Sequence, residues 1–363
     1  MLPESPRSST QSASAAESPV YSSPRAHLRN VPGGRLPLPA NADAAAGLHQ
    51  TKGSIADPWF LEPSSWEIDF KAVGEDDRIC YPDSGLDNFI AQMRSWLDQW
   101  TSENRCPFIH SRLYGSNIPS SLQHGLAAWQ VYRAATTPTS ERIALRMAES
   151  WSQNIVQEKA LSDNLHNAGE LPDLLEQLGR TQALLIFQVI GLFDGDVRAR
   201  AKAEGLLSIV SRWANELLGI AGAQVSSDHL ENPDELLNSP QIDRLRSCGT
   251  PASTWKAWIL SESIRRLWIV ATLTEAAFLI HQQGFATCPG SISFTARSGL
   301  WDAPSHHAWL AGLTKSNTVK IPVFCRRLDT LLDEARALDV DEFTQTVLAY
   351  GRGREAVEDW VAG

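Results

Sequence analysis

The chain has 363 residues, of which 43% are hydrophobic and 20% charged, and its formal net charge is −10. These proportions are typical of a soluble globular protein with a sizeable core, and they exclude a fibrous or wholly disordered chain. No uncharged run approaches the ~20 apolar residues that a membrane-spanning helix needs. The N-terminus lacks a basic segment followed by an apolar one, so we expect no secretory signal and an intracellular protein.

The charge is unevenly distributed along the chain. Residues 1–55 carry five basic and three acidic side chains, a net charge of +2, so the remaining residues carry −12. A body this acidic repels the phosphates of nucleic acids. Its basic residues are also interspersed with acidic ones, as in Asp243-Arg244 and in the stretch from Arg326 to Asp329. We therefore expect no direct DNA binding by this chain alone.

Residues 1–55 have the composition of a disordered tail or linker. Twelve of the first 30 residues are Ser or Pro, and large apolar residues stand singly, so no periodic face exists to bury. Ser-Pro steps at Ser5, Ser18 and Ser23 are either sites of proline-directed phosphorylation or residues that simply keep the linker open. We predict one folded domain over residues 56–363.

Beyond this tail, apolar residues recur at steps of three and four, which is the spacing of one helix face. The predicted helices cover residues 86–100, 119–132, 138–155, 171–193, 199–218, 253–283, 323–338 and 341–350. Asp83 or Ser84 is expected to cap the first helix, and Gly284 is a candidate C-cap of the longest. Strand signals are confined to residues 291–294 and 319–323. The sequence therefore predicts an all-α, multi-helix domain.

Sequence motifs for catalysis or metal binding are nearly absent. The chain has no glycine-rich phosphate loop, no Gly-x-Ser-x-Gly elbow and no His-Glu-x-x-His zinc helix. Asp302 lies four residues before His306-His307, a fragment of a metal site, but further ligands are lacking and a helix cap with surface histidines is favoured. Cys106 and His110 bring a thiol near an imidazole, and packing is favoured over a nucleophile there.

The five cysteines are too far apart for a zinc finger, and their odd number argues against a closed disulfide framework. We expect them to be reduced and mostly buried. They are Cys80, Cys106, Cys248, Cys288 and Cys325. Altogether, the sequence predicts no catalytic residue, no metal ligand and no cofactor.

One charged group stands out within the longest apolar run. Glu262 and Arg266 are four residues apart, the favourable order for a helix ion pair, and Arg265 lies beside them. Because unpaired burial of charge is expensive, the trio either pairs with another helix or lines a cleft that faces a ligand or partner. The 13 tryptophans indicate broad packing between helices or a small apolar effector pocket.

Several stretches resemble the C-terminal region of fungal zinc-cluster (Zn₂Cys₆) transcription factors, in the branch found beside secondary-metabolite genes. The most specific is the run from Trp255 to Trp268, with the pattern Trp-x-x-Trp…Glu-Ser-x-Arg-Arg-x-Trp. The others are residues 106–110 with 113–114, residues 118–123 with Tyr132, and residues 294–305. The resemblance implies a nuclear regulator with a helical regulatory region, protein partners that include other regulators as dimers, and a small-molecule effector.

The sequence departs from this family on one point, because Cys-x₂-Cys-x₆-Cys occurs nowhere in it. Either the protein lacks the DNA-reading module, or the chain is a shortened form of a longer one. No zinc ligand or DNA-contacting residue is therefore transferred to it. We predict a non-enzymatic transcription regulator of a secondary-metabolite gene cluster; the alternative is a biosynthetic enzyme or metabolite-binding protein with a helical fold.

Overall fold

The computed structural model describes residues 58–70, 78–165, 173–193, 196–226 and 250–363. The tail predicted over residues 1–55, its Ser-Pro steps and Cys248 lie outside the described residues. In the described part most residues are helical, and the strands are two-residue pairs. The all-α prediction is confirmed.

The helices follow one another along the chain with short connections. In the first part they are α1 (Asp83–Glu103), α2 (Ser120–Ala134), α3 (Pro138–Leu165), α4 (Leu174–Leu192), α5 (Val197–Glu204) and α6 (Leu207–Ser226). In the second part they are α9 (Pro251–Gln283), α10 (His306–Thr314), α11 (Thr330–Glu334), α12 (Glu342–Arg352) and α13 (Arg354–Ala362). Short 3-10 turns are η1 (Trp59–Leu61), η2 (Pro63–Trp66), η4 (Cys325–Arg327) and η5 (Ala337–Asp339).

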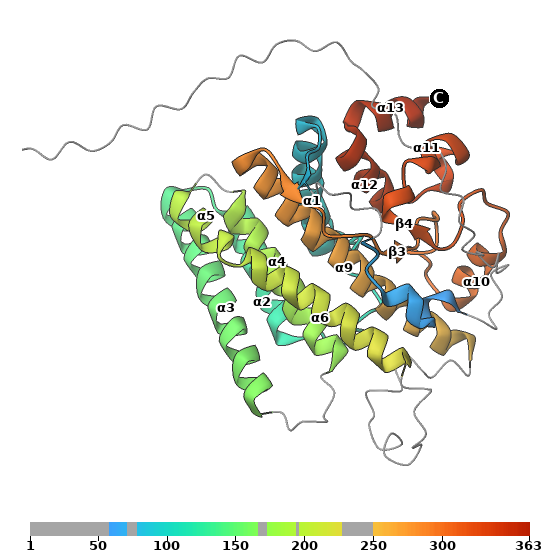
Figure 1. Cartoon of the computed structure of the whole chain (residues 1–363). Coiled ribbons are helices and arrows are strands. Elements are labelled where there is room, and N and C mark those ends of the chain that lie inside the picture. Colours follow the sequence, from blue (N-terminus) through green and yellow to red (C-terminus); the bar gives the residue numbers. More distant parts are fainter. Residues whose placement is uncertain (1–57, 71–77, 166–172, 194–195, 227–249) are drawn as a thin grey trace, which may run out of the picture. The chain divides into compact units, whose positions relative to one another are not determined.

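Helix α9 is the central element of this body. Every residue from Ala257 to Thr272 is buried, so the helix is covered on all sides over more than four turns. Figure 1 shows it between α4 and α6 on one side and α1 on the other. A capping box between Thr250 and Ser253 begins the helix, and Gly284 ends it with a left-handed φ of 87°. The predicted C-cap is confirmed.

The remaining elements pack around α9 as two groups. On one side α2 packs on α4, α3 on both, and α6 on α4 and α9; on the other, α1 packs against α12 and α12 against α13 (Figure 1). Two antiparallel strand pairs join distant segments. They are β1 (Arg78–Ile79) with β2 (Ala286–Thr287), and β3 (Ser293–Phe294) with β4 (Val323–Phe324). The two short strand signals each contribute one of these strands.

Three details of the predicted helices are wrong. The helix expected over residues 199–218 is two helices, because the chain turns at Gly205 and Leu206. Residues 323–338 are not one helix, since Val323 and Phe324 pair with β3 and only η4, α11 and η5 follow. Neither Asp83 nor Ser84 caps α1, because both lie inside it and Pro82 is the N-cap residue. Helix α13 was not predicted.

Truncating either of two tryptophans on α9 should destabilise the body. Trp258 and Trp268 are 1% and 3% exposed, and the indole of Trp268 donates a 2.7 Å hydrogen bond to Asn215. We expect Trp258→Ala and Trp268→Ala each to lower the free energy of unfolding by ~3–5 kcal/mol, measured by urea denaturation. Val197→Ala, at a side chain that is 78% exposed, is the control and should change it by under ~0.5 kcal/mol. A loss below about 1 kcal/mol at both tryptophans would show that α9 is peripheral.

Candidate functional site

The charged trio on α9 lies in the centre of the body rather than at its surface. Glu262 and Arg265 are 0% exposed and Arg266 is 1% exposed. A fourth charged residue, Asp341, joins them from the start of α12, where its carboxylate also accepts a 2.9 Å hydrogen bond from the backbone N–H of Thr344 as the N-cap. The four side chains together carry two positive and two negative formal charges.

Arg266 uses its guanidinium to join four segments of the chain. Its Nε donates to Glu262 at 3.1 Å, and its Nη2 donates to the Asp341 carboxylate at 2.5 Å. The carbonyl oxygens of Pro107 and Thr295 each accept from it at 3.0 Å. Glu262 in turn accepts the backbone N–H of Thr295 at 2.9 Å. The expectation that the trio pairs with another helix is confirmed for Arg266, and the partner is the N-cap of α12.

Arg265 holds the segment that precedes the first long helix. Its Nη2 donates to the carbonyls of Phe60 and Ser65 at 3.3 and 3.2 Å, and to the Ser65 hydroxyl at 2.8 Å. Its guanidinium also lies 3.9 Å from the ring centre of Trp66 and 4.9 Å from that of Trp59. Such cation–π contacts are strongest when they are desolvated, as here. Arg265 therefore fixes η1 and η2 against α9.

The electrostatics of the cluster favour a structural role. Burial lowers the pKa of Arg265 to about 10, which still leaves it protonated at neutral pH. Burial also lowers the pKa of Arg266, but the attraction of Asp341 and Glu262 outweighs it and the net shift is upward. Burial raises the pKa of Glu262 despite both arginines. Neither of the two cavities described below is lined by any of these four residues.

Cys106 and His110 do not form an activated thiol–imidazole pair. Burial raises the pKa of the Cys106 thiol to about 12 and lowers that of His110 to about 4, so both are neutral at pH 7. The Nδ1 atom of His110 accepts the backbone N–H of Arg112 at 3.0 Å, and its ring packs against Trp301 with centres 4.9 Å apart. Packing, the favoured interpretation, is what the structure shows.

The metal-site fragment near Asp302 does not assemble either. Ser305, not Asp302, caps α10, and its hydroxyl accepts the backbone N–H of Ala308. His306 and His307 stack with ring centres 3.9 Å apart. Among the residues that the structure describes, no group of three or more His, Cys, Asp or Glu side chains is placed to hold a metal ion. The favoured interpretation, a cap with surface histidines, is wrong only in which residue caps.

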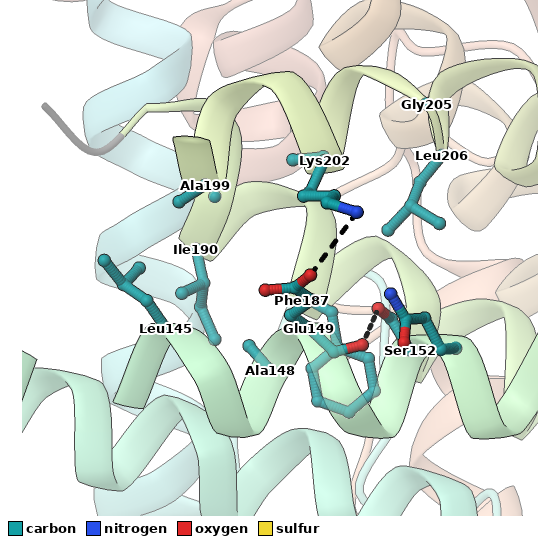
Figure 2. Close-up of a pocket in the computed structure, with 13 residues that line it drawn as sticks. Leu145, Ala148, Glu149, Ser152, Phe187, Ile190, Ala199, Lys202, Gly205 and Leu206 are labelled. Carbon is teal, nitrogen blue, oxygen red and sulfur yellow. Dashed lines mark hydrogen bonds and ion pairs between the residues drawn. The ribbon is translucent and has the colours of Figure 1, made fainter. Parts of the chain in front are cut away.

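A small hollow lies between α3, α4 and α5, with a volume of about 180 Å³. Figure 2 shows Lys202 of α5 pointing toward Glu149 of α3 across it, an ion pair of 3.6 Å. Aliphatic and aromatic side chains such as Ile190 and Phe187 form its floor. The volume is below the 300–1,000 Å³ of ordinary ligand sites. This hollow is therefore too small for a drug-sized ligand.

A larger cavity, of about 420 Å³, lies beside α9 on the α12 side. Five segments line it, which are residues 79–81, 268–276, 288–291, 325–329 and 347–352, together with Asp69. Cys80, Cys288 and Cys325 all face it, although they are scattered along the sequence. Sequence reasoning treated these cysteines as unconnected thiols, and no local spacing could have brought them together.

Comparisons with known proteins bear on the class of this chain. No protein-family model matches it, and no solved structure does. It is similar to a curated protein of Penicillium aethiopicum named "Transcription factor gsfR2", with 28% identity over 265 residues. The match covers 72% of this chain and 58% of that protein, so the chain spans little more than half the length of this relative. Of the two classes that the sequence left open, the similarity supports the fungal transcription regulator.

Removing the central cation should cost far more than removing an exposed one. Arg266→Met leaves two carboxylates buried without their cation, and we expect a loss of ~3–5 kcal/mol in the free energy of unfolding. Arg354→Met is the matched control, because Arg354 also pairs with a carboxylate four residues away but is 61% exposed; there we expect under ~1 kcal/mol. Equal losses in urea denaturation of the two variants would contradict a central role for Arg266.

Acid should destabilise the protein through His110. Its folded pKa of about 4 lies below the ordinary 6.5, so the unfolded chain binds the proton first as the pH falls. The contribution of neutral His110 is complete above pH 6.5 and is lost progressively toward pH 4. We expect the drop in unfolding free energy from pH 7 to 4.5 to be ~2–3 kcal/mol smaller in His110→Asn, which keeps an acceptor without titrating. Parallel pH profiles for the two proteins would disprove this.

Proposed function

We propose that this chain is a nuclear regulator of transcription that acts through protein contacts of its helical body. The supporting observation is the similarity to "Transcription factor gsfR2" over 265 residues. Only 57 residues precede the described body, so most of the matched residues must lie after residue 57. The similarity therefore concerns the helical body and not merely a tail.

We further propose that the regulator is of the fungal zinc-cluster type and controls a secondary-metabolite gene cluster. The stretches that resemble this family are the ones that Arg266 joins. Arg266 itself lies in the stretch Trp255 to Trp268, and its acceptors Pro107 and Thr295 lie in two others. The indole N–H of Trp301 also donates to the Cys106 carbonyl at 3.0 Å. The resemblance thus coincides with the centre of the fold, which favours a shared architecture over chance similarity.

The mode of action we propose is indirect, through a partner that carries a DNA-reading domain. Exposed arginines of the described body are paired with carboxylates, such as Arg133 with Asp98 at 3.0 Å and Arg354 with Glu358 at 2.6 Å. Such pairs leave little free positive charge for phosphates, and the body is acidic overall. The partners we propose are other regulators, including dimers with them, and a small-molecule effector.

The alternative of a pathway enzyme has less support. The thiol and imidazole that could have formed a nucleophilic pair are both neutral and buried. The strongly perturbed Glu262 is engaged by Arg266 and by a backbone N–H away from either cavity. An enzyme would need such groups to converge on a pocket. Binding of a metabolite, by contrast, needs only a pocket of suitable size.

A tethered reporter assay tests the regulatory function. The full chain would be fused to a heterologous DNA-binding domain and expressed in a fungal host with a reporter that carries the matching sites. We expect the fusion to change reporter output several-fold relative to the DNA-binding domain alone. Arg266→Met should abolish the change and Arg354→Met should keep it, because only the first disrupts the body. An inactive fusion that is folded and nuclear would contradict the proposal.

The same purified chain, without the added domain, tests the indirect mode. In a mobility-shift assay across promoter fragments at physiological salt, we expect no sequence-selective complex, since no basic stripe is available for phosphate contacts. Tight and salt-resistant binding by the isolated chain would overturn the indirect mode while leaving transcription regulation in place.

A further inference from the structure

The cavity beside α9 has the size and walls of a site for a small aromatic molecule. Its volume of about 420 Å³ falls within the range of ordinary ligand pockets. Rings of Trp268, Tyr81 and Tyr350 form part of its lining, and those of Tyr81 and Tyr350 lie 4.8 Å apart at 60°. Aromatic walls of this kind favour a planar aromatic guest, which gains edge or offset contacts beyond its buried area.

The polar atoms of these aromatic walls are committed elsewhere, with one exception. The Trp268 indole donates to Asn215 at 2.7 Å, and the Tyr350 hydroxyl donates to the Leu273 carbonyl at 3.2 Å. The Tyr81 hydroxyl makes no hydrogen bond with the residues that the structure describes. Burial raises the pKa of Tyr81 to about 12, helped by Cys288, Asp329, Cys325 and Cys80, which all line the cavity. The phenol is thus a neutral donor among the lining residues.

The charged residues of the lining are already neutralised. Arg326 pairs with Asp69, and Arg352 pairs with Asp329 through an Nε–Oδ1 distance of 2.7 Å. These four are all the charged residues of the lining, two cations and two carboxylates. Burial also raises the pKa of the Cys325 thiol to about 12, so it adds no negative charge. An ionic guest would lose its hydration without gaining a free counter-charge, so a neutral guest is favoured.

The backbone is shaped to keep the cavity open. Gly290 has a φ of +90°, and a Cβ there would lie 2.5 Å from Ile68, so glycine is required at this wall. Gly351 lies in the last turn of α12, and a Cβ there would meet only a Tyr81 ring atom at 4.0 Å. The absence of a side chain at Gly351 leaves space that a larger residue could fill.

We propose that this cavity binds a neutral, fused-ring aromatic molecule whose oxygen accepts a hydrogen bond from the Tyr81 hydroxyl. The ring system lies among the walls of Trp268, Tyr81 and Tyr350, and the thiols of Cys80, Cys288 and Cys325 complete the soft, polarisable lining. That such a molecule acts as an effector rests on the proposed function; its binding does not.

Three probes of similar shape separate the contributions in the purified full chain. They are 2-acetylnaphthalene, which is neutral with one acceptor, naphthalene, which has none, and 2-naphthoate, which is anionic. By titration calorimetry we expect 2-acetylnaphthalene to bind about three- to tenfold more tightly than naphthalene, the effect of one hydrogen bond. We expect 2-naphthoate to bind most weakly of the three, because no counter-charge is free.

Native thiols report where the probe binds. Iodoacetamide alkylation, resolved for each cysteine by peptide mass spectrometry, should slow several-fold at Cys80 and Cys288 when 2-acetylnaphthalene is present. Cys106, which is buried and lies outside this cavity, is the internal reference and should not change. Unchanged rates at both Cys80 and Cys288 would place the probe elsewhere and overturn the assignment.

Two variants test the cavity itself. Gly351→Leu should fill it and abolish binding, whereas Gly219→Leu, the same change at an exposed helical position with open space around it, should bind normally. Tyr81→Phe should remove the preference for 2-acetylnaphthalene over naphthalene and leave naphthalene affinity unchanged. If Gly351→Leu does not fold, Tyr81→Phe and the probe series decide the matter alone.

Several outcomes would overturn the proposal. These are no binding of 2-acetylnaphthalene, a preference that survives in Tyr81→Phe, tightest binding of 2-naphthoate, or normal binding by a folded Gly351→Leu. Failure here and failure of the proposed function are distinguishable. A chain that binds the probe but leaves the tethered reporter unchanged contradicts the regulatory role, and the reverse result contradicts only the binding site.

Discussion

The buried guanidinium of Arg266 is the interaction on which the rest of the structure depends. A guanidinium has five N–H donors, and Arg266 uses four of them on Glu262, Pro107, Thr295 and Asp341. Taking such a cation out of water costs several kcal/mol unless nearly all its donors are satisfied. The four acceptors come from α9, from the segment after α1, from the segment around β3 and from the N-cap of α12. Their arrangement is specific because only one geometry serves them all.

Arg265 extends this arrangement to the other side of the same helix. Successive residues on a helix point about 100° apart, so adjacent arginines reach different neighbours. Arg266 holds α12 and β3, while Arg265 holds η1 and η2 between the rings of Trp59 and Trp66. Glu262 lies one turn earlier and balances both cations. Two adjacent charges on an otherwise apolar helix thus fasten segments that are 75 and about 200 residues away in the sequence.

The sequence predicts the helices well where burial has a clear period, and poorly where a neighbour decides. Helix α9 is found with its C-cap at Gly284, since its apolar run and its terminating glycine are local features. The region after Val323 has a similar apolar period, yet Val323 and Phe324 pair with β3, and no local signal reveals that partner. The break between α5 and α6 at Gly205 is likewise small, and a single glycine is tolerated inside many helices.

The candidate site divides in the same way. Spacing alone identifies Glu262 and Arg266 as a pair, because they are one turn apart, but Asp341 enters through the tertiary packing of α1, α9 and α12. The cavity beyond them is invisible to sequence reasoning. Its three thiols come from segments that meet only once the two strand pairs form, and Tyr81 looks like any other tyrosine until its neighbours are known.

Helix α12 connects the charge cluster to the cavity. Its N-cap, Asp341, is held by Arg266, and its last turn, from Val347 to Arg352, lines the cavity and carries the pair with Asp329. A helix of 11 residues is stiff over this length, so its two ends cannot move independently. A guest that contacts Tyr350 therefore contacts an element whose other end is fixed by the central cation. In this fold, the same buried charge that specifies the architecture also sets the position of one wall of the cavity.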